Sequence, residues 1–488
     1  MWGTEDMHLA DLVDERASRA PEAPSVRDDA GALSDAELLR RVRQAASALS
    51  AQGVGAGDVV ALLLPNRVEL IVALFAAWRL GATVTPINPV LGDREAAYQV
   101  SDAGALVLVC DASDRDLGVP VVTLAALTEG PEHDSEPVHA DLALLIYTSG
   151  TTGTPKGVML THANLEAMTS SFIEWFELTE NDHSLLVLPL FHANGIVLGT
   201  LTPLRAGGQV SIVGRFSRDR FFAEVARHRP TYFSAVPAMY AMLSGLPEDA
   251  PFDTSSLRFA VCGAAPMPAE AIERFERRFR MTIVEGYGLS ETTTASTINP
   301  LRGVRKPGTV GLPLPGQQVR VVDERGASVP TGERGEVVIA GPVVMAGYLG
   351  KPEETAKTIV DGWLHTGDIG RFDDDGYLQI VDRIKDMIIR GGENIYPKEI
   401  ENALYTHDAV REAAVIGRAD DVLGEVPVAY VSLQEGAQVD AADLHAVCAD
   451  VLAGYKRPAE IILVEELPKN PVGKIDKPTL RNRERESV

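Results

Sequence analysis

Cysteine is scarce in this sequence, and the few that are present form no recognisable pattern. The 488 residues include three cysteines, Cys110, Cys262 and Cys448, which are far apart. Their number is odd and no Cys-x-x-Cys pair occurs, which argues against a disulfide framework and against a cysteine-based metal or redox site. This usage is typical of a reducing compartment, so we expect a cytoplasmic protein.

Long apolar runs are also missing. The most apolar stretch, residues 70–78, is bracketed by Glu69 and Arg79, and it is much shorter than the ~20 residues that a transmembrane helix needs. The first eleven residues contain no Lys or Arg ahead of an apolar core and carry three acidic residues instead. We therefore expect neither an integral membrane segment nor a secretory signal.

Positive charge is the third shortage. Lys and Arg number 45 against 69 Asp and Glu, which gives a net charge of −24. A nucleic-acid partner requires clustered cations that displace counterions from phosphates, so this balance argues against one. With 45% hydrophobic and 23% charged residues the composition is that of a globular protein, and the length suggests two to four domains of about 150 residues each.

Apolar runs alternate with helical patterns in the first part of the chain. Residues 38–49 have apolar positions at helical spacing after a capping box from Ser34 to Glu37, which predicts a helix. The apolar runs 59–64 and 82–87 enclose a helical stretch, a pattern typical of a strand–helix–strand unit with buried parallel strands. Four similar runs favour an α/β architecture: 142–147, 184–188, 209–213 and 258–262.

The pattern changes after Pro300. Short segments of alternating polarity at 318–322 and 335–339 lie between Pro and Gly clusters, and they predict a small antiparallel β region. From about residue 383 onward we expect a separate, compact α+β unit of roughly a hundred residues. Its expected elements are a helix near 398–405, strands near 413–416 and 427–433, and a helix near 441–452.

A loop rich in glycine and hydroxyl groups is the most informative segment. Residues 147–157, YTSGTTGTPKG, directly follow an apolar run and supply three glycines, five Ser or Thr hydroxyls and Lys156. Glycines let the backbone approach a ligand, and hydroxyls with one cation can hold a polyphosphate. The carboxyl end of a parallel strand is a usual ligand position, which favours this role over a flexible surface loop. The loop is not a Walker A motif, because Gly157 rather than Ser or Thr follows the lysine.

Five more motifs follow this loop in order along the chain. They are GYGLSET at 286–292, WLHTGD at 363–368, DRIKDM at 382–387, GGENIYPKEIE at 391–401 and NPVGKI at 470–475. Together the six motifs resemble the signature of the adenylate-forming superfamily, and in particular its AMP-forming acyl- and aryl-CoA ligases. The superfamily also includes peptide-synthetase adenylation domains and luciferases. Because the matches keep their order over about two thirds of the chain, the resemblance is specific.

The resemblance implies an α/β fold and a two-step reaction. Residues 1–382 would form a large N-terminal adenylation domain of parallel α/β layers with the small antiparallel β region. A hinge at 383–386 would lead to a small, mobile α+β C-terminal domain at 387–488. A carboxylate would attack the α-phosphate of ATP to give an acyl-adenylate and pyrophosphate, and a thiol would then displace AMP. The implied cofactors are ATP, Mg²⁺ and coenzyme A.

By the same resemblance, the loop and several later segments would bind the nucleotide. Glu291 would hold Mg²⁺ through water, together with Thr151, since Mg²⁺ prefers hard oxygen ligands. Thr292 would contact the α-phosphate, Tyr287 would stack on adenine, and Asp368 would accept the ribose hydroxyls. The implied ATP- and AMP-binding set is Thr148, Ser149, Gly150, Thr151, Thr152, Gly153, Lys156, Gly263, Ala264, Ala265, Gly286, Tyr287, Gly288, Asp368 and Arg383.

The C-terminal part contributes a lysine by the same resemblance. Lys474 would bridge the substrate carboxylate and the α-phosphate, a task that suits a point charge on a long stem. Only the resemblance separates it from the other cations nearby. Lys385 stands at the position of the hinge residue. The implied CoA-binding residues are Arg390, Gly391, Gly392, Lys456 and Arg457.

The segment FHANG at 191–195 resembles the part that lines the acyl pocket in acyl and aryl ligases. Amino-acid-activating relatives carry an Asp there, so His192 argues against an amino acid substrate. Malonate-type ligases carry an Arg where this chain has Gly286, and a buried second carboxylate would lack a partner. We therefore expect a hydrophobic monocarboxylic acid, whether fatty, aryl or polycyclic. The candidate pocket is His192, Gly195, Val236, Met239 and Leu289, and the implied catalytic residues are His192, Glu291, Thr292 and Lys474.

Alternatives stay open for the thiol and for the reaction class. The run 391–397 is typical of ligases that use free CoA, yet an acyl-AMP ligase that loads a separate carrier protein fits the same motifs. A luciferase-like monooxygenase has no residue in its favour. A non-catalytic acyl-binding protein is disfavoured because the expected cations and carboxylates are present. The expected partners are a carboxylic acid and CoA or a carrier protein, and the chain itself would be a monomer or homodimer.

Overall fold

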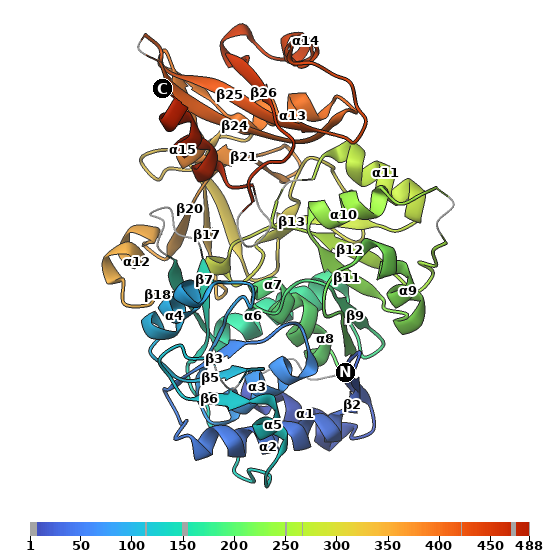
Figure 1. The fold of residues 1–488 in the computed structure, drawn as a ribbon. Coiled ribbons are helices and arrows are strands. Elements are labelled where there is room, and N and C mark those ends of the chain that lie inside the picture. The colour runs from blue at the N-terminus through green and yellow to red at the C-terminus, as the bar shows by residue number, and fades with distance from the viewer. Residues whose placement is uncertain are drawn as a thin grey trace. The chain divides into compact units, whose positions relative to one another are not determined.

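Two compact units make up the chain in the computed structural model (Figure 1). Unit 1 comprises residues 1–319 and 339–364, and unit 2 comprises residues 320–338 and 365–488. The structure describes residues 7–112, 115–148, 155–248, 251–265, 267–420, 422–469 and 475–487.

A seven-stranded sheet forms the first half of unit 1, in the order β18-β8-β7-β4-β3-β5-β6. β3 to β7 pair in parallel, whereas β8 runs antiparallel to β7 and β18 antiparallel to β8. The predicted strand–helix–strand unit is confirmed as β3, the buried helix α3 (Val68–Arg79) and β4. The strands are β3 (Val59–Leu63), β4 (Thr83–Pro86), β5 (Ala105–Cys110), β6 (Val121–Thr123), β7 (Leu142–Thr148), β8 (Lys156–Thr161) and β18 (Gly347–Tyr348).

A nine-stranded sheet forms the second half of unit 1, in the order β15-β14-β13-β12-β11-β9-β10-β1-β2. The six neighbours from β13 to β1 are parallel, and antiparallel strands complete both edges. Its strands are β1 (Pro24–Asp28), β2 (Gly31–Ser34), β9 (His183–Leu186), β10 (Gln209–Ile212), β11 (Tyr232–Ala235), β12 (Phe259–Cys262), β13 (Ile283–Tyr287), β14 (Thr297–Ile298) and β15 (Leu312–Pro313).

Helices cover both faces of both sheets in unit 1. Successive residues of one strand point to opposite faces and belong to different hydrophobic clusters. Examples are Leu185 and Leu186 of β9, and Ala61 and Leu62 of β3. The central cluster joins the sheets through α2 (Asp35–Ala51), α3 and α6 (His162–Phe176). The outer clusters use α9 (Arg218–His228), α10 (Pro237–Ser244) and α11 (Ala269–Phe279) on one side and α4 (Asp93–Asp102) on the other. The predicted parallel α/β layers are therefore confirmed.

The remaining helical elements of unit 1 are short. They are η1 (Leu9–Asp11), α1 (Leu12–Arg19), α5 (Leu124–Thr128), α7 (Ala193–Ile196), the π-helical turn η2 (Val197–Leu201), α8 (Thr202–Arg205), η3 (Ser290–Thr292) and α12 (Pro352–Thr358). The predicted capping box opens α2, where the Ser34 N–H donates to the Glu37 carboxylate at 2.8 Å and the Glu37 N–H to Ser34 Oγ at 3.3 Å.

The region after Pro300 forms a sheet that lies mostly in unit 2, whereas its strand β19 and the first residues of β20 belong to unit 1. The strand order is β16-β17-β20-β19, and β21 also pairs with β20. β20 is antiparallel to β19 and to β21, in agreement with the predicted antiparallel region. The strands are β16 (Gln318–Val322), β17 (Gly335–Ala340), β19 (Ile359–Val360), β20 (Trp363–Phe372) and β21 (Leu378–Arg383).

A second five-stranded sheet forms the end of unit 2, in the order β23-β22-β25-β24 with β26 beside β25. Helices α13 and α14 pack on one face and α15 on the other, which confirms the predicted α+β character. The hinge expected at 383–386 lies inside unit 2 and stays a prediction. The elements are η4 (Ile384–Asp386), β22 (Ile388–Arg390), β23 (Glu393–Ile395), α13 (Pro397–Tyr405), β24 (Val410–Asp420), β25 (Gly424–Leu433), α14 (Ala441–Val451), η5 (Gly454–Lys456), β26 (Glu460–Leu463) and α15 (Lys477–Ser487).

The three cysteines are buried and unoxidised. Among the described residues, no helix combines the length and apolarity needed to cross a bilayer.

Three histidines from distant parts of unit 1 stack on one another. The ring centroids of His8 and His139 lie 4.3 Å apart, and those of His8 and His162 lie 4.2 Å apart. Burial, with the charges of the other two rings, lowers the pKa of His162 to about 3. Burial also lowers the pKa of His8. The stack is thus stable only while these two rings are neutral.

We predict that this stack makes unit 1 less stable in mild acid. Because the pKa of His162 is below the unfolded value of about 6.5, the unfolded chain takes up the proton first as pH falls. Stability should fall by about 1.4 kcal/mol per pH unit below pH 6 for this one residue. His162→Gln should flatten the dependence of the urea midpoint on pH between 7.5 and 5. His445→Gln, in α14 of unit 2, is the control, and equal slopes for wild type and His162→Gln would contradict the prediction.

Candidate functional site

Four neighbouring strands of the nine-stranded sheet end at the predicted acyl and adenine segments. His192 follows β9, Val236 follows β11, Gly263 follows β12, and Tyr287 closes β13. Because these strands are parallel neighbours, their carboxyl ends meet at one edge of the sheet, the usual ligand position in α/β folds. The fold therefore gathers segments that are far apart in the sequence.

Close approach of the backbone requires the two glycines of the GYG motif. A Cβ at Gly288 would lie 2.4 Å from the backbone of both Thr294 and Ala295. A Cβ at Gly286 would lie 2.7 Å from the Ile298 side chain. Real Cβ atoms do not approach other atoms so closely, so this segment stays thin on both sides of the tyrosine between the glycines.

Two non-glycine residues near this edge have a positive φ. Ala264, in the predicted adenine wall, has φ +70°, and Thr293, next to Thr292, has φ +67°. Such a conformation costs about 1–2 kcal/mol per residue. Thr293 is held by its Oγ1, which donates to the Val343 carbonyl at 2.7 Å, and Thr292 is fully buried. Strain of this kind gathers where surrounding structure fixes a functional loop.

Glu285 is a residue of this edge that sequence reasoning missed. It is only 4% exposed, its Oε1 accepts the Met267 N–H at 2.9 Å, and its backbone carbonyl accepts the Asn299 N–H at 2.8 Å. The carboxylate thereby fastens the loop that contains Ala264 and Ala265. A charged residue inside the apolar run 283–287 is the signal that could have found it, because a buried carboxylate requires partners.

The phosphate loop falls largely outside the described residues. Outside them lie Ser149, Gly150, Thr151, Thr152 and Gly153. Thr148 closes β7 opposite Lys156, which opens β8. Antiparallel pairing with β7 thus extends to Lys156, which stands where the loop passes into β8, and its role in ATP binding stays a prediction.

Helix α4 holds both flanks of that loop. The Tyr147 hydroxyl donates to Asp102 Oδ2 at 2.7 Å, and the Tyr98 hydroxyl donates to the Pro155 carbonyl at 3.1 Å. Burial and the Asp102 charge raise the pKa of Tyr147, which keeps it a donor. Neither Tyr98 nor Asp102 belongs to a recognisable motif, so the sequence offered no signal for this support.

Lys156 and Glu291 contact the same tyrosine. The Lys156 ammonium lies 5.1 Å from the centroid of the Tyr348 ring, and the Tyr348 hydroxyl donates to Glu291 Oε1 at 2.9 Å. Lys156 also forms an ion pair with Glu354. The structure thus brings together the predicted phosphate cation and the predicted metal carboxylate through a residue that the motifs did not include.

The donors present fit Mg²⁺ that is bound jointly with phosphate. In the described part of the chain, no group of three or more His, Cys, Asp and Glu side chains could hold a metal ion. Glu291 is half-buried, and one of its oxygens accepts the Tyr348 hydroxyl. Mg²⁺ is commonly held by one or two carboxylates plus substrate phosphates. Glu291 would therefore serve as one oxygen ligand, directly or through water.

The predicted acyl residues lie on short helices after β9 and β11. His192 precedes α7, and its ring lies 4.5 Å from that of Phe191. A Cβ at Gly195 would lie 2.4 Å from the Pro189 carbonyl oxygen, so packing requires this glycine. Helix α7 continues into the π-helical turn η2, a feature that is frequent at functional sites.

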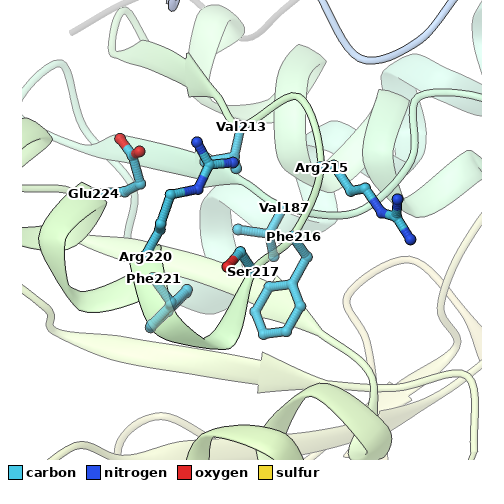
Figure 2. A pocket seen from close by; sticks show the side chains of 8 residues that line it. All are labelled: Val187, Val213, Arg215, Phe216, Ser217, Arg220, Phe221 and Glu224. Atoms are coloured by element: carbon cyan, nitrogen blue, oxygen red, sulfur yellow. The ribbon is translucent and has the colours of Figure 1, made fainter. Parts of the chain in front are cut away.

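A small cavity opens at the ends of β9 and β10, beside the start of α9 (Figure 2). Figure 2 shows the Arg215 side chain extending away from the others. Val213 and Phe216 pack against the same hydrophobic cluster as Met239, but the lining of the cavity includes none of the predicted acyl residues. Its lining is Val187, Val213, Arg215, Phe216, Ser217, Arg220, Phe221 and Glu224.

The two predicted ribose residues are partners in unit 2. Asp368 in β20 faces Arg383 in β21, and Arg383 Nε lies 2.9 Å from Asp368 Oδ1. Asp368 is 3% exposed, and its N–H donates to Thr366 Oγ1 at 3.0 Å. Glu336 accepts the Gly367 N–H at 3.0 Å. The part of β20 that carries Asp368 is therefore held by hydrogen bonds to the side chains of Thr366 and Glu336.

Buried charges surround the predicted hinge. Asp382 accepts the Arg383 and Lys398 N–H groups at 2.8 and 2.7 Å, and burial raises its pKa to about 6. Lys477 lies 2.8 Å from Glu401. Burial opposes ionisation of Glu401, but the charges of Lys477 and Lys398 outweigh it and lower the pKa of Glu401 to about 2. Burial also lowers the pKa of Lys385, the predicted hinge residue.

The predicted CoA-binding cations already have partners within unit 2. Arg390 donates to the Tyr455 carbonyl at 2.7 Å, Lys456 pairs with Glu399 at 2.5 Å, and Arg457 donates to the Ala449 carbonyl at 2.9 Å. Gly391 and Gly392 have φ +59° and +86° in the turn between β22 and β23.

The lysine predicted to serve adenylation, Lys474, lies outside the described residues. The chain on either side of it is paired, because Lys469 and Ile475 form an antiparallel bridge and the Asp476 N–H donates to the Pro468 carbonyl at 2.8 Å.

Known proteins match this chain over nearly its whole length. The family model AMP-binding enzyme matches residues 13–349, and AMP-binding enzyme C-terminal domain matches residues 399–474. A feruloyl-CoA synthase from Amycolatopsis sp is 40% identical and is matched over 97% of its length and 96% of this chain. A long-chain-fatty-acid–CoA ligase from Bacillus subtilis is 32% identical, and the match covers 95% of its length and 98% of this chain.

Solved structures match as well. The o-succinylbenzoate coenzyme A synthetase from Bacillus subtilis, in complex with ATP and magnesium ion, has a TM-score of 0.88 to this chain at 33% identity. The match covers 97% of this chain and 99% of that one.

We predict that the Lys477–Glu401 pair stabilises unit 2. Lys477→Met should lower the free energy of unfolding of unit 2 by about 3 kcal/mol, because it leaves a buried carboxylate without its main partner. The double variant Lys477→Met/Glu401→Leu should recover most of the loss. Hydrogen exchange of unit 2 peptides in the full chain measures both.

The control is Lys469→Met, which removes a cation from a more exposed pair with Glu412 at 3.0 Å. It should cost less than about 1 kcal/mol. A Lys477 variant no less stable than this control would contradict the assigned role of the pair.

Proposed function

Because the chain belongs to the AMP-binding enzyme family, we propose that it joins a hydrophobic monocarboxylic acid to coenzyme A at the expense of ATP. It is an enzyme, an AMP-forming acid–thiol ligase. One observation carries the proposal for this chain. The segments predicted to bind the acid and the nucleotide follow the carboxyl ends of β9, β11, β12 and β13, which are neighbouring parallel strands of one sheet.

In the first step, a carboxylate oxygen of the acid attacks the α-phosphorus of ATP. The bond from this phosphorus to the bridging oxygen breaks, and pyrophosphate leaves with its electron pair. Two anions approach each other, so the site has to supply positive charge where negative charge develops. Lys156 and Lys474 would supply it from the protein, and Mg²⁺ would neutralise phosphate charge when bound at Glu291.

The nucleotide-binding roles follow the family resemblance residue by residue. We assign adenine to Tyr287 and the wall Gly263–Ala265, and the ribose hydroxyls to Asp368. Asp368 is suited to this task because it is buried, and a hydrogen bond from its N–H to Thr366 Oγ1 fixes this part of β20. Arg383, already paired with Asp368, would fix the orientation of the carboxylate.

In the second step, the CoA thiolate attacks the acyl carbonyl carbon, the bond to the AMP oxygen breaks, and AMP leaves. We propose that residues 387–488 move about a hinge at 383–386 between the steps, with Lys385 as the hinge residue. Gly391 and Gly392 would let the pantetheine arm pass. Arg390, Lys456 and Arg457 would exchange their present partners for CoA phosphates.

The apolar lining around the predicted acyl segment supports a hydrophobic acid. Val236, Met239 and Leu289 are apolar and half-buried. No cation is available at position 286 to pair with a second carboxylate, because the site there is a tightly packed glycine. The names of two relatives, feruloyl-CoA synthase and long-chain-fatty-acid–CoA ligase, agree with an aryl or fatty acid.

We predict that a substrate panel will separate apolar monocarboxylates from polar acids. In ATP–pyrophosphate exchange, ferulate, benzoate or medium-chain fatty acids should exceed malonate and amino acids at least tenfold in kcat/KM. A buried second charge without a partner costs more than the ~1.4 kcal/mol that corresponds to tenfold. Malonate or an amino acid outperforming all apolar acids would overturn the assignment, and acyl-CoA formation with free CoA tests the thiol.

We predict that Lys474→Ala separates the two steps. Adenylation should fall at least a hundredfold, because the cation at the developing charge is lost. Thioester formation from supplied acyl-adenylate should stay within about threefold of wild type. Lys469→Ala is the control and should leave both steps unchanged. Equal losses in both steps would contradict a lysine that acts in adenylation alone.

A further inference from the structure

We propose that Glu354 and Tyr348 are positioning residues of the phosphate site. Glu354 is the resting counter-ion of Lys156, which a polyphosphate has to displace, and Tyr348 holds Glu291 in its metal-binding orientation. The inference rests on the proposed function and assigns roles to two residues outside the six motifs.

Strand β18 ties the phosphate strand to the metal carboxylate through its backbone. At one end the Leu349 N–H donates to the Gly157 carbonyl at 2.9 Å, directly after Lys156. At the other end the Met345 N–H donates to the Glu291 carbonyl at 2.9 Å. The two functional side chains are thus fixed relative to each other by the five residues 345–349.

Tyr348 contacts both Lys156 and Glu291, the first with its ring and the second with its hydroxyl. The residue is 9% exposed; its ring lies under the Lys156 ammonium, and its hydroxyl donates to Glu291. A second hydrogen bond to the metal carboxylate is the usual way in which proteins orient such ligands.

Glu354 neutralises the charge of Lys156 by forming an ion pair with it. The ion pair is partly exposed, with 15% of the Lys156 side chain and 37% of the Glu354 side chain accessible. The hydrogen bond from Lys156 lowers the pKa of Glu354, which keeps the carboxylate ionised at neutral pH. Two anions compete for one cation, so phosphate binding has to break this pair first. Because the pair is partly exposed, breaking it costs little, and the exchange is feasible.

The turn around Glu354 is built to hold it there. Thr355 Oγ1 accepts the Tyr348 N–H at 2.9 Å and donates to the Lys351 carbonyl at 2.9 Å. A Cβ at Gly347, which has φ +143°, would lie 2.8 Å from the Thr355 side chain. Helix α12 is thereby packed against β18, and Glu354 in its first turn faces Lys156.

Isothermal titration calorimetry of the full chain tests the counter-ion role. With saturating Mg²⁺, Glu354→Gln should bind ATP and inorganic pyrophosphate about three- to tenfold more tightly than wild type. The matched control is Glu353→Gln, which removes the neighbouring exposed carboxylate and one unit of charge but no contact with Lys156. Unchanged or weaker binding by Glu354→Gln, or an equal gain in both variants, would overturn the role. Wild type that binds no ATP would overturn the proposed function instead.

The Mg²⁺ dependence of ATP binding tests the role of Tyr348. Tyr348→Phe keeps the ring under Lys156 and removes only the hydroxyl. The Mg²⁺ concentration for half-maximal ATP binding should rise about tenfold, while ATP affinity at saturating Mg²⁺ stays within twofold. Tyr348→Leu should weaken ATP binding at all Mg²⁺ concentrations. A Tyr348→Phe variant with unchanged Mg²⁺ dependence, or with affinity lost equally at all Mg²⁺ concentrations, would overturn the positioning role.

Discussion

Burial of both faces of two parallel sheets is the constraint on which the rest of unit 1 depends. Helices cover every face, so strand interiors are apolar and carry little chemistry. Parallel strands point their carboxyl ends the same way, and the polar loops collect along one edge. The predicted acyl segment after β9, the predicted adenine wall after β12 and the predicted metal carboxylate after β13 follow neighbouring strands for this reason.

Electrostatics then has to work locally. With a net charge of −24, the global field opposes ATP, pyrophosphate and CoA instead of steering them. The described site cations are already paired: Lys156 with Glu354, Arg383 with Asp368, and Lys456 with Glu399. Under the proposed function, binding of polyanions would exchange these partners, and each carboxylate partner would influence affinity.

Unit 2 uses buried charge for a different purpose. Asp382 lies near the end of β21, Glu401 in α13 and Lys477 at the start of α15. Removal of one charge from this cluster leaves another buried with fewer partners. Such a cluster fixes the packing of α15 against the sheet more specifically than apolar contacts alone. Asp382, a member of this cluster, directly precedes the predicted hinge at 383–386.

The sequence by itself determined the layers and the chemistry. The capping box before α2, the unit from β3 to β4 and the six motifs are local patterns, and local patterns are readable because helix, strand and turn preferences act over a few residues. Only the tertiary structure decided that Lys156 opens a strand. It also decided that Tyr348, Glu354 and Asp102 contact residues of the predicted site. These partners are 45 to 198 residues from the groups that they contact. Pairing across such distances follows from strand register and packing, which no local pattern encodes.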